Sequence, residues 1–217
     1  MIVDPIRPRL VLVTTPLTDA DAEAGLRNAL SGGDVASVIL DPAGRDADAF
    51  QRFAEPLVPL IQAAGAAAIV ADDTQCAGRL KADGIHLTAG DIPALGEAVA
   101  RFSPKLIVGC SGFETRHDAL DAGERLPDYL FFGRFGGDTD PQLHPKNLKM
   151  AEWWAEIVEI PCILMMGSSI ESAEAASASG AEFVAAAAAV FADLSEAGAK
   201  VARANAIFDA WFEQAAA

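Results

Sequence analysis

Short apolar segments alternate with amphipathic segments of helical spacing along almost the whole chain. The apolar segments end in small or acidic residues, which is typical of strands that lead into helices. We predict strands at Leu10 to Thr14, Val35 to Leu40, Ala67 to Ala71, Gly84 to Leu87, Leu106 to Cys110, Tyr129 to Phe132, Cys162 to Met166 and Phe183 to Val190. Such alternation predicts a parallel sheet with helical crossovers, and eight units in roughly 200–250 residues match a closed (β/α)8 TIM barrel, an α/β fold.

Helices are predicted between these strands. They are expected at Asp19 to Ser31, Asp46 to Gly65, Thr74 to Lys81, Ile92 to Phe102, Glu114 to Gly123, Asn147 to Val158, Ile170 to Ser179 and from Leu194 onward. Pro56 and Pro59 fall inside the second of them. Because an interior proline costs a helix about 3 kcal/mol, we expect a kink or two shorter helices there.

The composition is that of one well-filled domain. The chain has 217 residues, of which 52% are hydrophobic, and no Pro/Gly/Ser-rich linker interrupts the alternation. Barrels commonly reach this length as one domain, so residues 1–217 are expected to form one. The pattern does not fix the oligomeric state, and a homo-oligomer is compatible with it.

The charge balance narrows the range of partners. Lys and Arg total 16 against 31 Asp and Glu, a net charge of −15. Because this surface repels phosphate backbones and anionic lipid, neither nucleic acid nor membrane is an expected partner. A phosphorylated substrate would need a metal, basic side chains or helix N-termini to offset this negative charge.

Three cysteines without metal-ligand spacing indicate a reduced, cytoplasmic protein.

Acidic and hydroxyl side chains follow several predicted strands. Asp72, Asp91 and Ser111 all come just after strands, so in a barrel they face one mouth. Two converging carboxylates suit Mg²⁺, which is usually held by one or two carboxylates and substrate phosphate.

Helix capping is the alternative for each of these residues. Asp72 precedes Gln75 and Ser111 precedes Glu114 by three positions, as in capping boxes, and Asp91 precedes a helix that begins Ile92-Pro93. Taken singly, each residue is best explained as a cap. Their common position on one rim favours a binding site.

The last two strand-to-helix loops are candidates for phosphate binding. Gly167 and Ser168 follow the seventh strand, and Ala189 and Val190 belong to the eighth loop. In barrels these two loops often bind phosphate through backbone N–H groups, although a tight turn explains the same residues.

His86 lies within a predicted strand, which favours a hydrogen-bonded core residue over a catalytic base.

At these loops the chain resembles the thiamine-phosphate synthase family of (β/α)8 barrels. The resemblance spans nearly the whole chain and is carried by segments in the family order, which are Ala64 to Asp73, Lys81 to Leu87 with Asp91, Val108 to Ser111, Asp128 to Gly133, Ile160 to Gly167 and Gly180 to Glu182. It implies a transferase that couples hydroxymethylpyrimidine pyrophosphate to thiazole phosphate with Mg²⁺ and releases pyrophosphate.

The resemblance also implies roles for individual residues. Asp72 and Asp91 would bind Mg²⁺, and Ser111 would act on the pyrophosphate as the catalytic contact. Gly167, Ser168 and the backbone at Ala189 and Val190 would hold the thiazole phosphate.

The chain departs from the family pattern at three positively charged or polar motifs. The family's Gln-x-Arg-x-Lys is replaced by Ile39 to Ala43, its asparagine before the first metal-binding aspartate by Ala71, and its Thr-x-Thr-Lys by Gly136 to Pro141. Arg134 or Arg45 is a candidate for the lost positive charge. The alternative is therefore a barrel that binds a phosphorylated ligand with lost or changed activity, either a regulatory module or an enzyme for another phosphorylated small molecule.

Overall fold

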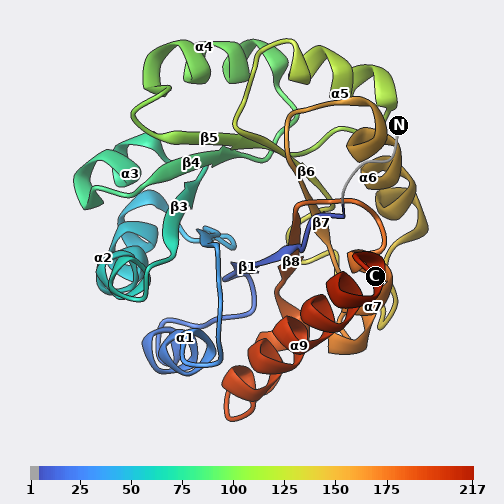
Figure 1. Cartoon of the computed structure of the whole chain (residues 1–217). Coiled ribbons are helices and arrows are strands. Elements are labelled where there is room, and N and C mark those ends of the chain that lie inside the picture. The colour runs from blue at the N-terminus through green and yellow to red at the C-terminus, as the bar shows by residue number, and fades with distance from the viewer. Residues whose placement is uncertain (1–4) are drawn as a thin grey trace.

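The computed structural model describes residues 5–217, so the first four residues of the predicted domain lie outside it. Eight parallel strands form a closed barrel in chain order, with β1 paired to β8 (Figure 1). The strands are β1 (Arg9–Val13), β2 (Ser37–Leu40), β3 (Ala67–Ala71), β4 (Gly84–Leu87), β5 (Ile107–Cys110), β6 (Tyr129–Phe132), β7 (Cys162–Met165) and β8 (Phe183–Ala186). The predicted (β/α)8 barrel is confirmed.

Helices surround this barrel, and the last helix packs beside the first (Figure 1). They are α1 (Ala22–Leu30), α2 (Ala47–Ala63), α3 (Thr74–Leu80), α4 (Ile92–Phe102), α5 (Arg116–Gly123), α6 (Pro145–Ile157), the 3-10 helix η1 (Ile170–Ser172), α7 (Ala173–Ser177), α8 (Ala188–Phe191) and α9 (Ala197–Ala215). Within residues 5–217 no helix is both long and apolar enough to cross a membrane.

Two hydrophobic clusters stabilise the barrel. The inner cluster fills the barrel with alternate strand residues, among them Val11, Ile69, Phe131 and Met165. The outer cluster joins the other face of the strands to the helices and includes Trp154, whose side chain is fully buried. Strands that are buried on both faces explain the continuous apolar segments of the sequence.

The structure differs from the sequence prediction at two elements. The second helix is one helix and not two shorter ones, because Pro56 and Pro59 both lie on its exposed side, where water can bind the carbonyls they leave free. The alternative of a kink stays a prediction. The eighth strand ends at Ala186 instead of Val190, and the chain turns at Ala187 into the short helix α8.

Candidate active site

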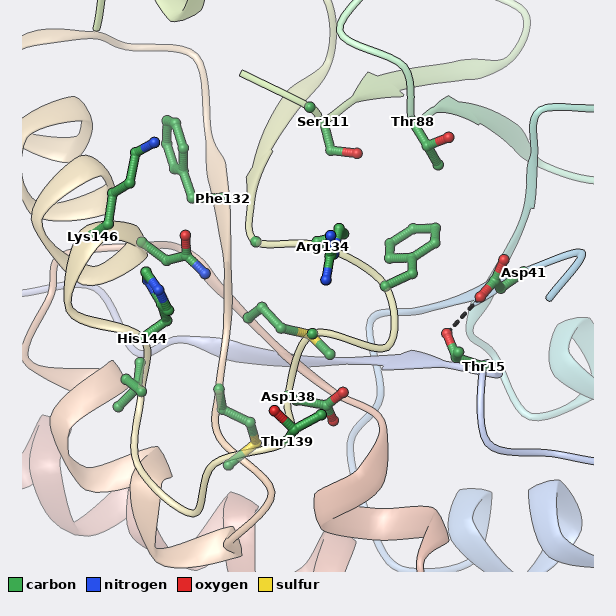
Figure 2. A pocket seen from close by; sticks show the side chains of 18 of the residues that line it. Thr15, Asp41, Thr88, Ser111, Phe132, Arg134, Asp138, Thr139, His144 and Lys146 are labelled. Carbon is green, nitrogen blue, oxygen red and sulfur yellow. Dashed lines mark hydrogen bonds between the residues drawn. The ribbon is translucent and has the colours of Figure 1, made fainter. Parts of the chain in front are cut away.

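A cavity of about 1170 Å³ opens at the rim where the strands end. Its lining includes at least one residue that follows each of the strands β1 to β7, and Figure 2 shows the labelled side chains around it. In this view Ser111 and Thr88 lie on one side of the pocket, and Asp138 and Thr139 lie on the opposite side. Barrel enzymes place their reacting groups at this same end.

Asp72 lines the cavity, and its backbone adopts the left-handed conformation. Its φ of 56° lies in the left-handed region, where aspartate is commoner than most residues, while its N–H still bonds His86 O at 2.9 Å. Its carboxylate accepts hydrogen bonds from Thr88 N at 2.9 Å and from Thr88 Oγ1 at 2.5 Å. The neighbouring Asp73 caps helix α3 instead. Thr88 therefore holds the Asp72 carboxylate at the rim, and Asp72 does not cap this helix.

The two predicted metal ligands occupy different surroundings. Asp91 is the N-cap of α4, where its Oδ1 accepts a hydrogen bond from Ala94 N at 3.0 Å, and it is not part of the cavity lining. Asp72 and Asp91 thus lie on successive loops, but the cavity is lined only by the first of them.

Ser111 belongs to a buried chain of hydrogen bonds. His86 Nε2 lies 3.0 Å from Ser111 Oγ, and His86 Nδ1 lies 2.9 Å from the hydroxyl oxygen of Tyr129. Burial lowers the pKa of His86 from 6.5 to about 3, so the ring is neutral at physiological pH. A neutral imidazole accepts one of these two bonds and donates the other, so its tautomer decides where the Ser111 proton points. Ser111 does not cap α5, because Thr115 does so with Asp118 in a capping box.

A glycine and several aromatic residues surround the hydrogen-bonded side chains of His86, Ser111 and Tyr129. A Cβ on Gly109 would lie 1.9 Å from Tyr129 Cζ, so only glycine leaves space for the phenol ring. Phe135 stacks on His86 with ring centroids 5.2 Å apart. Phe113, Phe132 and Phe135 all line the cavity. Its walls therefore offer several flat apolar faces next to polar oxygens.

The cavity is rich in acidic side chains. Among residues 5–217, five carboxylates line it, those of Asp41, Asp72, Glu114, Asp138 and Asp140, against the two cations of Arg134 and Lys146. Arg45 lies outside this lining, because it pairs with Asp19 at 2.7 Å and covers Phe53. Of the two arginines considered from the sequence, only Arg134 faces the cavity.

The donor set suits a hard cation bound together with an anionic ligand. Carboxylate and hydroxyl oxygens are the ligands that Mg²⁺ prefers, and substrate phosphate commonly completes its shell. Within residues 5–217 no group of three His, Cys, Asp or Glu side chains could hold a metal ion. A cation here would therefore depend on the ligand for part of its coordination.

The four residues predicted to hold the thiazole phosphate do not line the cavity. Gly167 is buried and Ser168 is half-buried where the connection between β6 and α6 contacts them, and Ala189 and Val190 are buried in the outer hydrophobic cluster. The structure thus brings Asp72, Ser111 and Arg134 into one cavity and leaves Asp91, Gly167, Ser168, Ala189 and Val190 outside its lining.

Sequence reasoning missed several lining residues. Thr15, Asp41 and Thr88 are polar residues at the ends of β1, β2 and β4, so the rule that identified Asp72 would have found them. Asp138 and Lys146 lie in or after the irregular β6–α6 connection, which gives no local signal.

Fold and site together define a (β/α)8 barrel with a cavity at its carboxyl-terminal rim. The sequence model described as "Thiamine monophosphate synthase" matches residues 10–190. The chain belongs to this family.

Individual relatives agree with that assignment. The thiamine-phosphate synthase of Rhodospirillum centenum is 37% identical over 180 residues, which are 82% of this chain and 86% of the relative. That of Hyphomonas neptunium is 32% identical, over 94% of this chain and 95% of the relative. Thiamine phosphate pyrophosphorylase from Pyrococcus furiosus superposes with a TM-score of 0.76 at 21% identity, covering 94% and 97% of the two chains. The superposition supports the fold.

Proposed function

We propose that this chain catalyses the thiamine-phosphate synthase type of reaction. A pyrimidinylmethyl group is transferred from its pyrophosphate to a thiazole nitrogen, and pyrophosphate is released. The resemblance to the family implies that the acceptor is thiazole phosphate. The observation that carries the proposal is the rim cavity of a family member, lined by both carboxylate oxygens and aromatic rings.

The lining suits the electron movements of this reaction. The bond between the methylene carbon and the pyrophosphate oxygen breaks, and its electron pair leaves with pyrophosphate. The lone pair of the thiazole nitrogen forms the new C–N bond and leaves a thiazolium cation. No proton moves, so the reaction needs no general base, and His86, which is buried behind Ser111, is neutral and weakly basic. Carboxylate oxygens and aromatic faces both stabilise the positive charge that develops on the organic fragment.

Pyrophosphate needs positive charge in this acidic cavity. Arg134 and Lys146 are the cationic groups of the lining, and Ser111 can donate its hydroxyl hydrogen when His86 carries its proton on Nε2. A bound Mg²⁺ would supply further positive charge to the leaving group, with Asp72 as the protein ligand. Asp91 as a second ligand remains a prediction from the resemblance.

A coupling assay tests the proposal. Purified protein is incubated with Mg²⁺, the pyrimidine pyrophosphate and either thiazole phosphate or the corresponding thiazole alcohol, and the product is oxidised to fluorescent thiochrome. We expect product from the wild-type chain and at least a tenfold lower rate for Asp72→Asn, a difference of about 1.4 kcal/mol in the activation barrier.

Asp73→Asn is the matched control. It removes the same charge one residue away, outside the cavity lining, and asparagine still caps α3. We expect its rate to equal that of the wild type. If the wild type gave no product with either acceptor beside an active relative, the proposal would be rejected and the alternative of a binding barrel without this activity would stand.

A further inference from the structure

The hydroxyl of Tyr129 is held inside the barrel, where it has one hydrogen-bond partner. Tyr129 is 7% exposed and belongs to the inner hydrophobic cluster. Among residues 5–217 its hydroxyl oxygen bonds only His86 Nδ1, at 2.9 Å. A phenol O–H is a donor, and a buried donor without an acceptor is costly. The Tyr129 hydrogen is therefore directed at His86 Nδ1.

This direction fixes the tautomer of His86. Nδ1 accepts the hydrogen of Tyr129, so it carries no proton of its own, and the one proton of the neutral ring lies on Nε2. Nε2–H then donates to Ser111 Oγ at 3.0 Å. The other tautomer would leave the Tyr129 hydrogen without an acceptor in the described part of the chain.

Ser111 consequently keeps its own hydrogen for the cavity. Its Oγ accepts from His86, and among residues 5–217 it has no other hydrogen-bond partner. Ser111 lines the cavity wall (Figure 2). In the other tautomer the Ser111 hydrogen would be directed at His86 Nε2, and the hydroxyl would present only lone pairs, which repel an anionic group.

The strand registers bring Tyr129 to His86 through a glycine. Gly109 is the register partner of His86 on β4 and of Tyr129 on β6, and a Cβ on Gly109 would lie 1.9 Å from Tyr129 Cζ. The phenol ring thus passes over β5 and stacks on the imidazole with centroids 5.6 Å apart. A phenylalanine would fill the same space, so packing alone does not require the hydroxyl of the chain's one tyrosine.

We propose that Tyr129 is a positioning residue, which makes Ser111 a hydrogen-bond donor to an anionic group in the cavity. Tyr129 acts through the tautomer of His86, and neither residue belongs to the cavity lining. The inference rests on the reaction proposed above, in which the anionic group is the leaving pyrophosphate. The bond from Ser111 strengthens as negative charge develops on the leaving oxygen, and no proton is transferred.

Nitrogen-15 NMR of the unliganded protein tests the tautomer without any turnover. The rings of His86, His117 and His144 are labelled, and His86→Gln assigns the resonances of His86. At pH 7.5 we expect the proton on Nε2 in the wild type. In Tyr129→Phe we expect the ratio of the Nε2–H to the Nδ1–H tautomer to fall at least fivefold, since the Nδ1–H form no longer leaves a donor unpaired.

Ser177→Ala is the matched control for the loss of a buried hydroxyl. Ser177 Oγ donates to Ala173 O at 2.8 Å and lies outside the cavity lining, so this variant should keep the wild-type tautomer and kcat. A wild-type ring protonated on Nδ1 would overturn the inference, and so would an unchanged tautomer ratio in Tyr129→Phe.

A double-mutant cycle in the coupling assay links the tautomer to the reaction. Ser111→Ala and Tyr129→Phe should each lower kcat at least fivefold and change the KM for the pyrimidine pyrophosphate less. The double variant should be no slower than Ser111→Ala, because Tyr129 acts only through Ser111. Effects that multiply would show a separate structural role and contradict the inference. If the wild type gave no product, the reaction would be rejected, and the NMR result would still decide whether Tyr129 makes Ser111 a donor.

Discussion

His86 should make the stability of the fold depend on pH in a way that can be isolated. The ring is buried between Tyr129 and Phe135, and burial lowers its pKa from 6.5 to about 3. Because the folded-state pKa lies below that of the unfolded chain, the unfolded chain binds more protons between these values. The full stability is present above pH 6.5 and falls as the pH decreases from 6.5 toward 3.

The size of this pH effect follows from the one proton that His86 binds in the unfolded chain. Stability falls by about 1.4 kcal/mol for each pH unit within this window, so between pH 7.5 and pH 5.5 the loss through His86 is about 1.4 kcal/mol. Other groups add their own pH dependence, so the quantity to compare is the difference between the wild type and a variant without the imidazole.

Urea unfolding at the two pH values provides the measurement. His86→Gln should be less stable than the wild type at pH 7.5, because it loses the geometry of the bonds to Ser111 and Tyr129. Its deficit should shrink by about 1.4 kcal/mol at pH 5.5. His117→Gln, whose native side chain is 83% exposed, should show no such change. A deficit for His86→Gln that is the same at both pH values would refute the reasoning, since His86 would then titrate equally in both states.

Other features lead to two further predictions. Gly109→Ala should reduce the free energy of unfolding by at least about 2 kcal/mol, because its Cβ would overlap the Tyr129 ring. Gly78→Ala, whose Cβ would have no atom within 4 Å, should raise the free energy of unfolding by about 0.5–1 kcal/mol. Urea unfolding measures both, and equal effects would contradict the packing. Cys110 and Cys162 should resist iodoacetamide at pH 8 in the folded protein, because burial raises the pKa of Cys110 to about 12 and that of Cys162 further, and fast labelling would contradict this.

The sequence predicts the barrel well because each strand is apolar on both faces. It predicts the end of the eighth strand poorly, because Ala185 to Ala189 carry no periodicity and alanine favours a helix as soon as pairing stops. The first N–H of the helix that follows Ala187 bonds Asp138, which is distant in the sequence, so no local pattern marks the turn.

The same limit applies to the site. Polar residues directly after strands can be found from the sequence, and this rule identified Asp72 and Ser111. The partners of His86 cannot be found in this way, because Tyr129 lies 43 positions away and meets His86 through the registers of β4, β5 and β6. Asp138 meets Ala188 across 50 positions, and its residue type gives no indication of this partner.

Closure of the barrel through β1 and β8 has a consequence for synthesis of the chain. The two paired strands are separated by about 170 residues, so β1 has no partner on one edge until β8 leaves the ribosome. At roughly 5–20 residues per second this interval lasts about 9–35 s. During that time the apolar edge of β1 can pair with other nascent chains. Slow translation near the carboxyl end should therefore lower the yield of native protein more than slow translation near the start.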